Sequence, residues 1–267
     1  MRGRSYARRI SLARMTRAET LRLEAIAFRS WPAANLVNHK GVLLRSTGGE
    51  SRRANSAAVY ACDPGVGVEE IVATGEAFYG ERGRRALFQV GPTAPPGLDD
   101  ALASRGYTIE APVWVQTGLL GSLPGRAYDD RHAGVEAAVA GSPDEAWIEV
   151  EIARGRYAGI ATTFLDVLAR LGPRAGFATA RIGSAAAAAC LLVHDEDVVV
   201  VAAMRTLPEA RRRGAARALL RAGLSWAAAR GARAALLQVE RDNDAALALY
   251  EAEGFATQYG YHYRVQP

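Results

Sequence analysis

The sequence predicts an α/β protein in two parts. Apolar residues at helical spacing alternate along the chain with short β-branched or apolar runs, which is the pattern of sheets covered by helices. Residues 118–134 contain glycine, serine, proline and charged residues and have little to bury, so they predict a linker between the parts. A length of 267 residues suits one large domain or two modest ones, and 49% apolar residues exclude intrinsic disorder.

The N-terminal part, residues 17–117, is expected to form an α/β domain without a catalytic motif of its own. Its expected elements are helices at 17–29, 68–81 and 97–104 and strands at 41–45, 55–62, 85–90 and 107–116. The turn at 47–50 predicts a hairpin between the first two strands. Pro112 interrupts the last strand and predicts that it is an edge strand or a bent one.

The C-terminal part, residues 135–267, has a clearer pattern. Its expected elements are helices at 144–154, 160–171, 215–230 and 244–253 and strands at 177–182, 185–193, 198–206, 234–239 and 259–264. Residues 198–204 form a continuous apolar run, which predicts a strand buried on both faces. A tight loop follows this strand and leads into a helix that Gly231 is expected to end as a C′ glycine.

The loop between that strand and that helix is a candidate anion-binding site. Gly214, Ala215 and Ala216 have little or no side chain, so a phosphate can approach the unpaired N–H groups of the helix N-terminus. Four arginines surround the turn and can neutralise phosphates: Arg211, Arg212, Arg213 and Arg217. The alternative is that arginines crowd here as they do elsewhere, because Lys40 is the only lysine among 33 basic residues.

Two motifs here resemble those of the GCN5-related N-acetyltransferase (GNAT) family. Arg211-x-x-Gly214-x-Ala216 is similar to the family's R/Q-x-x-G-x-G/A motif, and Pro208 precedes it as is common there. The family's second hallmark is matched at every position by Asn243-x-x-Ala246-x-x-Leu249-Tyr250-x-x-x-Gly254-Phe255. The motifs occur in the expected order around a helix and a strand, and the resemblance covers residues 147–264.

The resemblance implies a GNAT fold for the C-terminal part, a mixed sheet flanked by helices, with acetyl-CoA as co-substrate. In the family, the loop at 211–217 wraps the pyrophosphate of acetyl-CoA, chiefly through backbone N–H groups. The end of the preceding strand binds the pantetheine arm and polarises the thioester carbonyl, and here it consists of Met204, Arg205 and Thr206. Asn243 lies where the family contacts the cofactor, and its alternative role is to cap the following helix.

Tyr250 matches the family's general acid, which protonates the departing CoA thiolate; the alternative is a core aromatic. The proton acceptor is left open. In relatives that acetylate the N-terminal alanine of ribosomal proteins, a glutamate five residues before the asparagine is the general base, and Gln238 occupies that position here. Glu240, Glu149, Glu151 or an ordered water chain are the alternatives. Some acceptor is needed, because an amine with a pKa of roughly 10 must lose a proton before it attacks.

The N-terminal part has an element order similar to that of the GNAT fold as well. We therefore expect a tandem protein whose first half is a degenerate copy that has lost the cofactor loop. Under this hypothesis, the first half shapes the acceptor pocket or a subunit contact. The sequence leaves a homodimer open.

The resemblance implies an N-acetyltransferase that transfers acetyl directly to a primary amine of a small molecule or amino acid in a ternary complex. No cysteine lies near the motifs to form an acyl intermediate, and Cys190 lies on an apolar strand where we expect it to be inert. A protein or peptide amine is the alternative acceptor. A non-catalytic acyl-CoA-binding regulatory module is the alternative of another class, and the presence of Tyr250 argues against it.

Composition limits the remaining possibilities. Residues 1–17 contain six arginines and no acidic residue, and the net charge of +5 falls to −1 without them. We therefore expect a disordered basic tail at 1–16, or extra sequence before a true start at Met15, and no nucleic-acid binding by the near-neutral body. No apolar run reaches the roughly 18 residues that cross a bilayer. The two cysteines indicate a reducing, cytoplasmic location, and the scattered histidines predict no metal site.

Overall fold

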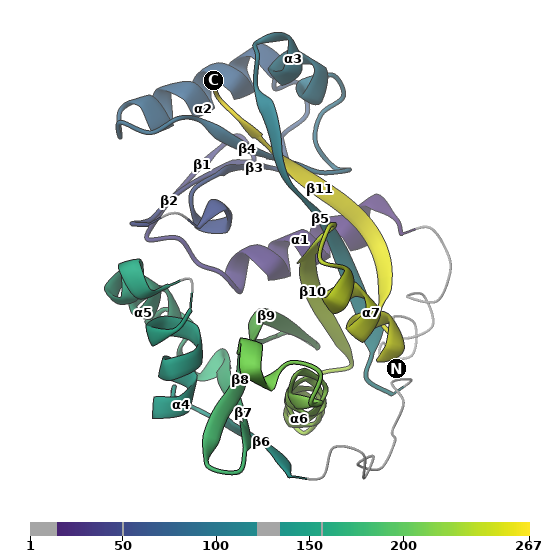
Figure 1. The fold of residues 1–267 in the computed structure, drawn as a ribbon. Helices are drawn as coiled ribbons and strands as arrows, with labels where there is room; N and C mark the ends of the chain where they lie inside the picture. The colour runs from purple at the N-terminus through teal and green to yellow at the C-terminus, as the bar shows by residue number, and fades with distance from the viewer. Residues whose placement is uncertain (1–14, 50, 122–133, 156) are drawn as a thin grey trace. The chain divides into compact units, whose positions relative to one another are not determined.

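The computed structural model describes residues 15–49, 51–121, 134–155 and 157–267. They form two compact units (Figure 1). We call residues 15–115, 239–244 and 257–267 the N-unit, and residues 116–238 and 245–256 the C-unit. The chain thus returns to the N-unit twice, which the expected division at 117 and 135 did not include. Most of the basic tail and most of the expected linker, 118–134, lie outside the described residues.

The N-unit is a mixed sheet with helices. Its elements are α1 (Arg17–Arg29), β1 (Asn35–His39), β2 (Val42–Ser46), β3 (Ala57–Val59), α2 (Val68–Gly80), β4 (Leu87–Val90), α3 (Leu98–Ser104), the start of β5 (Thr108–Leu119) and nearly all of β11 (Ala256–Val265). The strand order is β1-β2-β3-β4-β11-β5. Strands β1, β2 and β3 are antiparallel, β3 and β4 are parallel, and β4 and β11 are antiparallel.

Local sequence features explain the start of α1, the packing of α2 and the turn between two strands of the N-unit. Thr16 starts α1 with a capping box, in which its hydroxyl accepts from the Glu19 N–H at 3.2 Å and its N–H donates to the Glu19 carboxylate at 2.8 Å. Helix α2 packs closely on the sheet because Gly75 leaves room for the Phe88 ring of β4. The expected hairpin is confirmed as the β2–β3 pair.

One feature of the N-unit, strand β1, differs from the expectations, whereas a second, the strand that contains Pro112, agrees with them. Strand β1 was not predicted, because Leu36 and Val37 are exposed and the segment has no buried face that would produce an alternating pattern. The backbone departs from extended geometry at Ala111, whose φ is +41°, so the strand containing Pro112 is bent.

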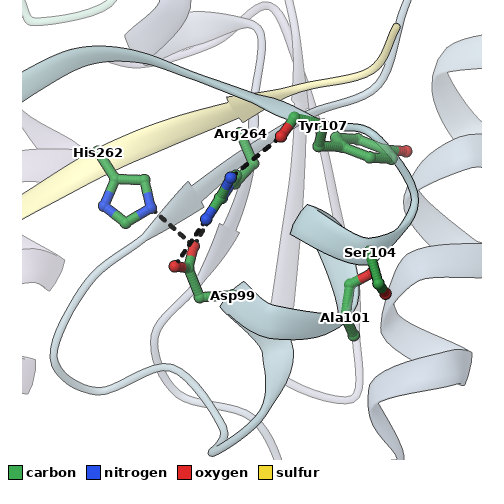
Figure 2. Close-up of polar contacts among 6 residues, drawn as sticks. All are labelled: Asp99, Ala101, Ser104, Tyr107, His262 and Arg264. Atoms are coloured by element: carbon green, nitrogen blue, oxygen red, sulfur yellow. Dashed lines mark hydrogen bonds and ion pairs between the residues drawn. The ribbon is translucent and has the colours of Figure 1, made fainter.

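The last strand is fixed in the N-unit by a polar cluster (Figure 2). Arg264 donates to both oxygens of Asp99, at 2.8 and 2.9 Å, and to the Tyr107 carbonyl at 3.0 Å. His262 Nε2 lies 2.7 Å from Asp99 Oδ1. These contacts, led by the hydrogen bond from Arg264, lower the pKa of Asp99 to about 2. The carboxylate therefore joins α3 to β11 as an anion.

The C-unit also combines parallel and antiparallel strands with helices. Its elements are β6 (Val135–Ala140), α4 (Glu145–Ile148), a π-helical turn (Glu149–Ala153), α5 (Ala161–Ala169), β7 (Ala175–Ile182), β8 (Ala185–Asp195), β9 (Val198–Thr206), α6 (Ala215–Ala228), most of β10 (Ala234–Glu240) and α7 (Asp244–Ala252). The strand order is β10-β9-β8-β7-β6, in which only the β9–β10 pair is parallel. Strand β6 was not predicted.

Helices cover both faces of this sheet, with α6 on one side of β7 and β8 and α4 and α5 on the other (Figure 1). Consecutive residues of β7 show the alternation: Gly176 lies against Trp226 of α6, whereas the Phe177 ring meets the Trp147 ring of α4 at 5.2 Å. The helix expected at 144–154 is α4 followed by the π-helical turn, in which the Arg154 N–H donates to the Glu149 carbonyl.

Candidate active site

Strands β9 and β10 separate at the end that leads into the predicted anion-binding loop. Their parallel register runs only from Val198–Ala234 to Val201–Leu237, although β9 continues to Thr206. The backbone of β9 beyond Val201 is therefore not paired with β10. An extended ligand can bind to a strand edge of this kind by main-chain hydrogen bonds.

The same end of β9 contains a β-bulge against β8. The register passes from Ala189–Arg205 to Leu191–Ala202, so Ala203 and Met204 both lie opposite Cys190. Ala203 has a φ of +47°, which is unusual for a residue with a side chain. A bulge redirects the backbone groups around it, and bulges are frequent beside active sites. Met204, the first of the predicted strand-end residues, lies in this bulge.

The predicted anion-binding loop has a backbone shaped for an anion. Arg212 has a φ of +62° and Gly214, the N-cap of α6, has a φ of +83°. Within the described part of the chain, none of the N–H groups of residues 212–217 donates to a backbone carbonyl. Left-handed turns with free N–H groups at a helix N-terminus form concave anion sites. The residues present thus fit a diphosphate.

The arginine side chains of this loop divide into two groups. Arg211, Arg212 and Arg213 are exposed, and among the described residues none of them has a carboxylate within ion-pair distance. Arg217 differs, because its Nε lies 2.9 Å from Oε1 of the buried Glu253. The free positive charge at the loop therefore comes from the three consecutive arginines.

Tyr250 lies directly beside the bulge. Its hydroxyl donates to Met204 Sδ at 3.3 Å, and the residue is only 7% exposed. Phe255 closes the end of α7, since its N–H donates to the Tyr250 carbonyl at 2.9 Å. Burial raises the pKa of Tyr250 above its ordinary value, and the nearby Cys190 adds to this shift. The phenol is therefore protonated at neutral pH and has a proton to donate.

The side chains of the other strand-end residues have local roles. Arg205 donates through a terminal nitrogen to the Arg154 carbonyl at 2.6 Å, which joins β9 to the π-helical turn. Arg154 in turn pairs with Glu209 at 2.6 Å. The Leu207 N–H donates to the Ala187 carbonyl at 2.9 Å. The predicted roles of Arg205 and Thr206 toward a ligand stay predictions that concern their backbone.

The candidate proton acceptors differ in their exposure and in the unit to which they belong. Glu149 is exposed and lies 3.6 Å from Arg154, whereas Glu151 is 1% exposed and lies within electrostatic range of Cys190. Gln238 is half-buried on β10, and Glu240 is exposed in the segment assigned to the N-unit.

Asn243 is in the same N-unit segment as Glu240, on the turn directly before α7. Its N–H donates to the Glu240 carbonyl at 3.1 Å. Both of its predicted roles, in cofactor binding and in helix capping, stay predictions.

Cys190 is fully buried, and burial raises the pKa of its thiol. It is therefore a neutral thiol, as expected of an inert core cysteine. Across the described ranges, no three His, Cys, Asp or Glu side chains are grouped so that they could hold a metal ion. No helix in the described part of the chain is long and apolar enough to cross a membrane.

Comparison with known proteins agrees with this geometry. Residues 17–264 match the family described as "probable histone acetyltransferase Rv0428c C-terminal". The chain is 29% identical over 250 residues to the uncharacterized N-acetyltransferase YobR of Bacillus subtilis (strain 168), covering 92% of this chain and 98% of that protein. These matches identify the chain as an acetyltransferase of the GNAT superfamily. The chain belongs to the Rv0428c C-terminal family of this superfamily.

Solved structures show the same fold. A GCN5-related N-acetyltransferase from Kribbella flavida superimposes with a TM-score of 0.70 at 22% identity, over 92% of this chain and 95% of that one. A tandem GNAT protein from the clavulanic acid biosynthesis pathway superimposes with a TM-score of 0.62 at 15% identity, over 95% of this chain and 90% of that one. The GNAT fold expected from the two motifs is confirmed.

Proposed function

We propose that the protein transfers the acetyl group of acetyl-CoA directly to a primary amine of a small molecule or amino acid. The observation that supports this most is the Tyr250 hydroxyl, 3.3 Å from Met204 Sδ at the bulged strand end. A protonated phenol at this point can protonate a thiolate that leaves from the adjacent strand edge. A module that only binds acyl-CoA has no need of such a group.

The chain's residues divide the work of the reaction. The N–H groups of residues 212–217, with Arg211, Arg212 and Arg213, hold the diphosphate. The backbone at Met204, Arg205 and Thr206 aligns the pantetheine arm and polarises the thioester carbonyl. Acetyl-CoA supplies the acetyl group as a thioester. When the amine nitrogen bonds to the carbonyl carbon and the C–S bond breaks, Tyr250 gives its proton to the sulfur.

The amine proton also needs an acceptor, and we infer that Glu151 fills this role. Glu151 is a buried carboxylate of the C-unit within electrostatic range of Cys190, and it lies on a π-helical turn, a distortion that is frequent at functional sites. Glu149 already pairs with Arg154 and is exposed to water.

A second candidate acceptor is a protein or peptide amine. It is favoured by the description of the matching family, which names a probable histone acetyltransferase. The chemistry at Tyr250 is the same for both acceptors, so they differ only in what binds beside the acetyl group.

Thiol release from acetyl-CoA, measured against a panel of amines, amino acids and lysine-containing peptides, tests the proposal. We expect Tyr250→Phe to lower kcat about 100-fold with little change in KM for acetyl-CoA, because the phenol acts on the leaving group. Glu151→Gln is expected to lower kcat and to remove the part of the pH dependence of kcat that comes from the ionisation of a basic group. Glu149→Gln is the matched control and is expected to behave like the parent. Equal rates for Tyr250→Phe and the parent at every pH contradict the assignment.

A further inference from the structure

Glu253 is a buried acid that joins the two helices of the proposed active site. It follows α7 by one residue, and its side chain is only 4% exposed. Arg221 of α6 donates to both of its carboxylate oxygens, at 2.8 and 2.9 Å. Arg217, one turn earlier on α6, places its Nε 2.9 Å from Oε1. One carboxylate is thus held by two guanidinium groups of a single helix.

The two ends of this contact are functional segments. Arg217 is the third residue of α6, in the turn whose N–H groups are proposed to hold the diphosphate. Glu253 is bonded to the end of α7, since its N–H donates to the carbonyls of Leu249 and Tyr250 at 3.1 and 3.2 Å. The carboxylate therefore connects the phosphate-binding end of α6 with the backbone of the proton donor.

The position of this charge needs an explanation. An acid at the C-terminal end of α7 is disfavoured by the dipole of that helix, and burying a carboxylate is costly unless it is fully paired. The two-pronged bond to Arg221 and the charge of Arg217 offset this cost. A structural contact between two helices does not require a buried charge, because apolar residues of similar volume usually serve as well.

We propose that Glu253 is a positioning residue, which fixes Tyr250 relative to the phosphate-binding end of α6 so that the phenol lies at the thiol of the bound co-substrate. This inference rests on the proposed function. The hydroxyl of Tyr250 must point at one sulfur atom, and a displacement of about 1 Å at a catalytic group lowers rates by up to about 100-fold.

A double-mutant cycle tests the proposal on the full-length protein. Glu253→Gln keeps the shape of the side chain and removes its charge, and we expect kcat to fall about 10-fold at saturating acetyl-CoA. In the Tyr250→Phe background, the same substitution is expected to change kcat less than 2-fold, because the group that it positions is gone. A merely structural defect lowers kcat by the same factor in both backgrounds, and that result overturns the proposal.

Two further variants complete the test. Glu251→Gln makes the same charge change two residues earlier, at an exposed position of α7, and is expected to leave kcat unchanged. Arg221→Lys keeps the charge but loses the two-pronged bond, so it decides the question if Glu253→Gln does not fold. It is expected to lower kcat about 5-fold, again only when Tyr250 is present.

The outcomes separate the two proposals. No thiol release by the parent with any acceptor, or an unimpaired Tyr250→Phe variant, overturns the proposed function and this inference with it. A slow Tyr250→Phe variant beside a normal Glu253→Gln or Arg221→Lys variant overturns only the role of Glu253.

Discussion

The N-unit and the C-unit share one order of elements but differ in the loop that leads from the third antiparallel strand into the next helix. Each has a helical segment, three antiparallel strands, a helix, a strand parallel to the third and a shorter helix: α1-β1-β2-β3-α2-β4-α3 in the N-unit and α4/α5-β7-β8-β9-α6-β10-α7 in the C-unit. The strand-to-helix loop of the C-unit contains Arg211, Arg212 and Arg213. The corresponding loop of the N-unit contains Asp63 and no arginine, and the first turn of α2 contains Glu69 and Glu70.

The helix N-caps show the same contrast in backbone geometry. Both helices have a glycine at the N-cap, Gly214 for α6 and Gly67 for α2. Gly214 has a φ of +83°, a conformation that favours glycine, whereas Gly67 has a φ of −75°, which any residue adopts. The N-unit therefore has the same order of elements without a left-handed turn at this N-cap, and its origin as a degenerate copy of the GNAT fold stays a prediction.

The two units also differ in the surroundings of a buried carboxylate, Glu24 on α1 of the N-unit and Glu151 on the π-helical turn of the C-unit. In the N-unit, Glu24 of α1 is buried beside Gln89 and Arg45, and burial raises the pKa of this carboxyl to about 7. In the C-unit, Glu151 lies near Cys190 and the proposed site. One order of strands and helices thus surrounds a hydrogen-bonded polar core in the N-unit and, in our proposal, a reaction site in the C-unit.

The largest expected effect on acetyl-CoA binding comes from a substitution that disrupts the turn at Gly214. Gly214→Val forces a β-branched residue into a left-handed conformation and fills the place of the diphosphate, so we expect at least a 100-fold loss of acetyl-CoA affinity by calorimetry. Gly67→Val is the matched control and is expected to bind normally, with about one acetyl-CoA per chain. Two molecules bound by the parent, or lost affinity in both variants, contradicts the contrast between the units.

An intermediate effect is expected from the loop charges. Arg212→Gln together with Arg213→Gln removes two exposed guanidinium groups, so we expect about 10-fold weaker acetyl-CoA binding and a weaker dependence on salt. The matched change in the N-unit is Asp63→Asn, which is expected to alter neither quantity. Affinity of the arginine variant equal to that of the parent at low salt contradicts the proposed role.

The smallest effect concerns the strand that returns to the N-unit. Because the pKa of Asp99 is lowered to about 2 from 3.8, its contribution to stability is present above about pH 4 and is lost as the pH falls toward 2. Asp99→Asn is expected to cost on the order of 1 kcal/mol at pH 7, since the side chain is 39% exposed and water screens the pair.

Thermal unfolding of the parent and the Asp99→Asn variant between pH 2 and 7 measures this difference. The neighbouring, exposed Asp100→Asn is the control and is expected to follow the parent. A difference between Asp99→Asn and the parent that stays constant down to pH 2 contradicts the ion pair as its source.

The helices were the most predictable part of the fold, because their apolar stripes and caps are local. Helices α1, α2, α6 and α7 lie where periodicity places them, and the glycine-containing loop between β9 and α6 was recognised from residue types and spacing alone. Strand β1 was not predicted because its side chains are exposed. The π-helical turn escaped because its sequence, Glu149–Ala153, has ordinary helical character.

The sequence by itself determined the residue types of the site: a turn of small residues among arginines, and a tyrosine at a fixed distance before a glycine. Only the tertiary structure decided that β9 bulges at Ala203, that Met204 meets Tyr250, and that Glu253 joins α7 to α6. The physical reason is the separation along the chain over which each kind of interaction acts. Caps, turns and periodicity act over a few residues, whereas register, bulges and buried ion pairs depend on partners far apart in the chain.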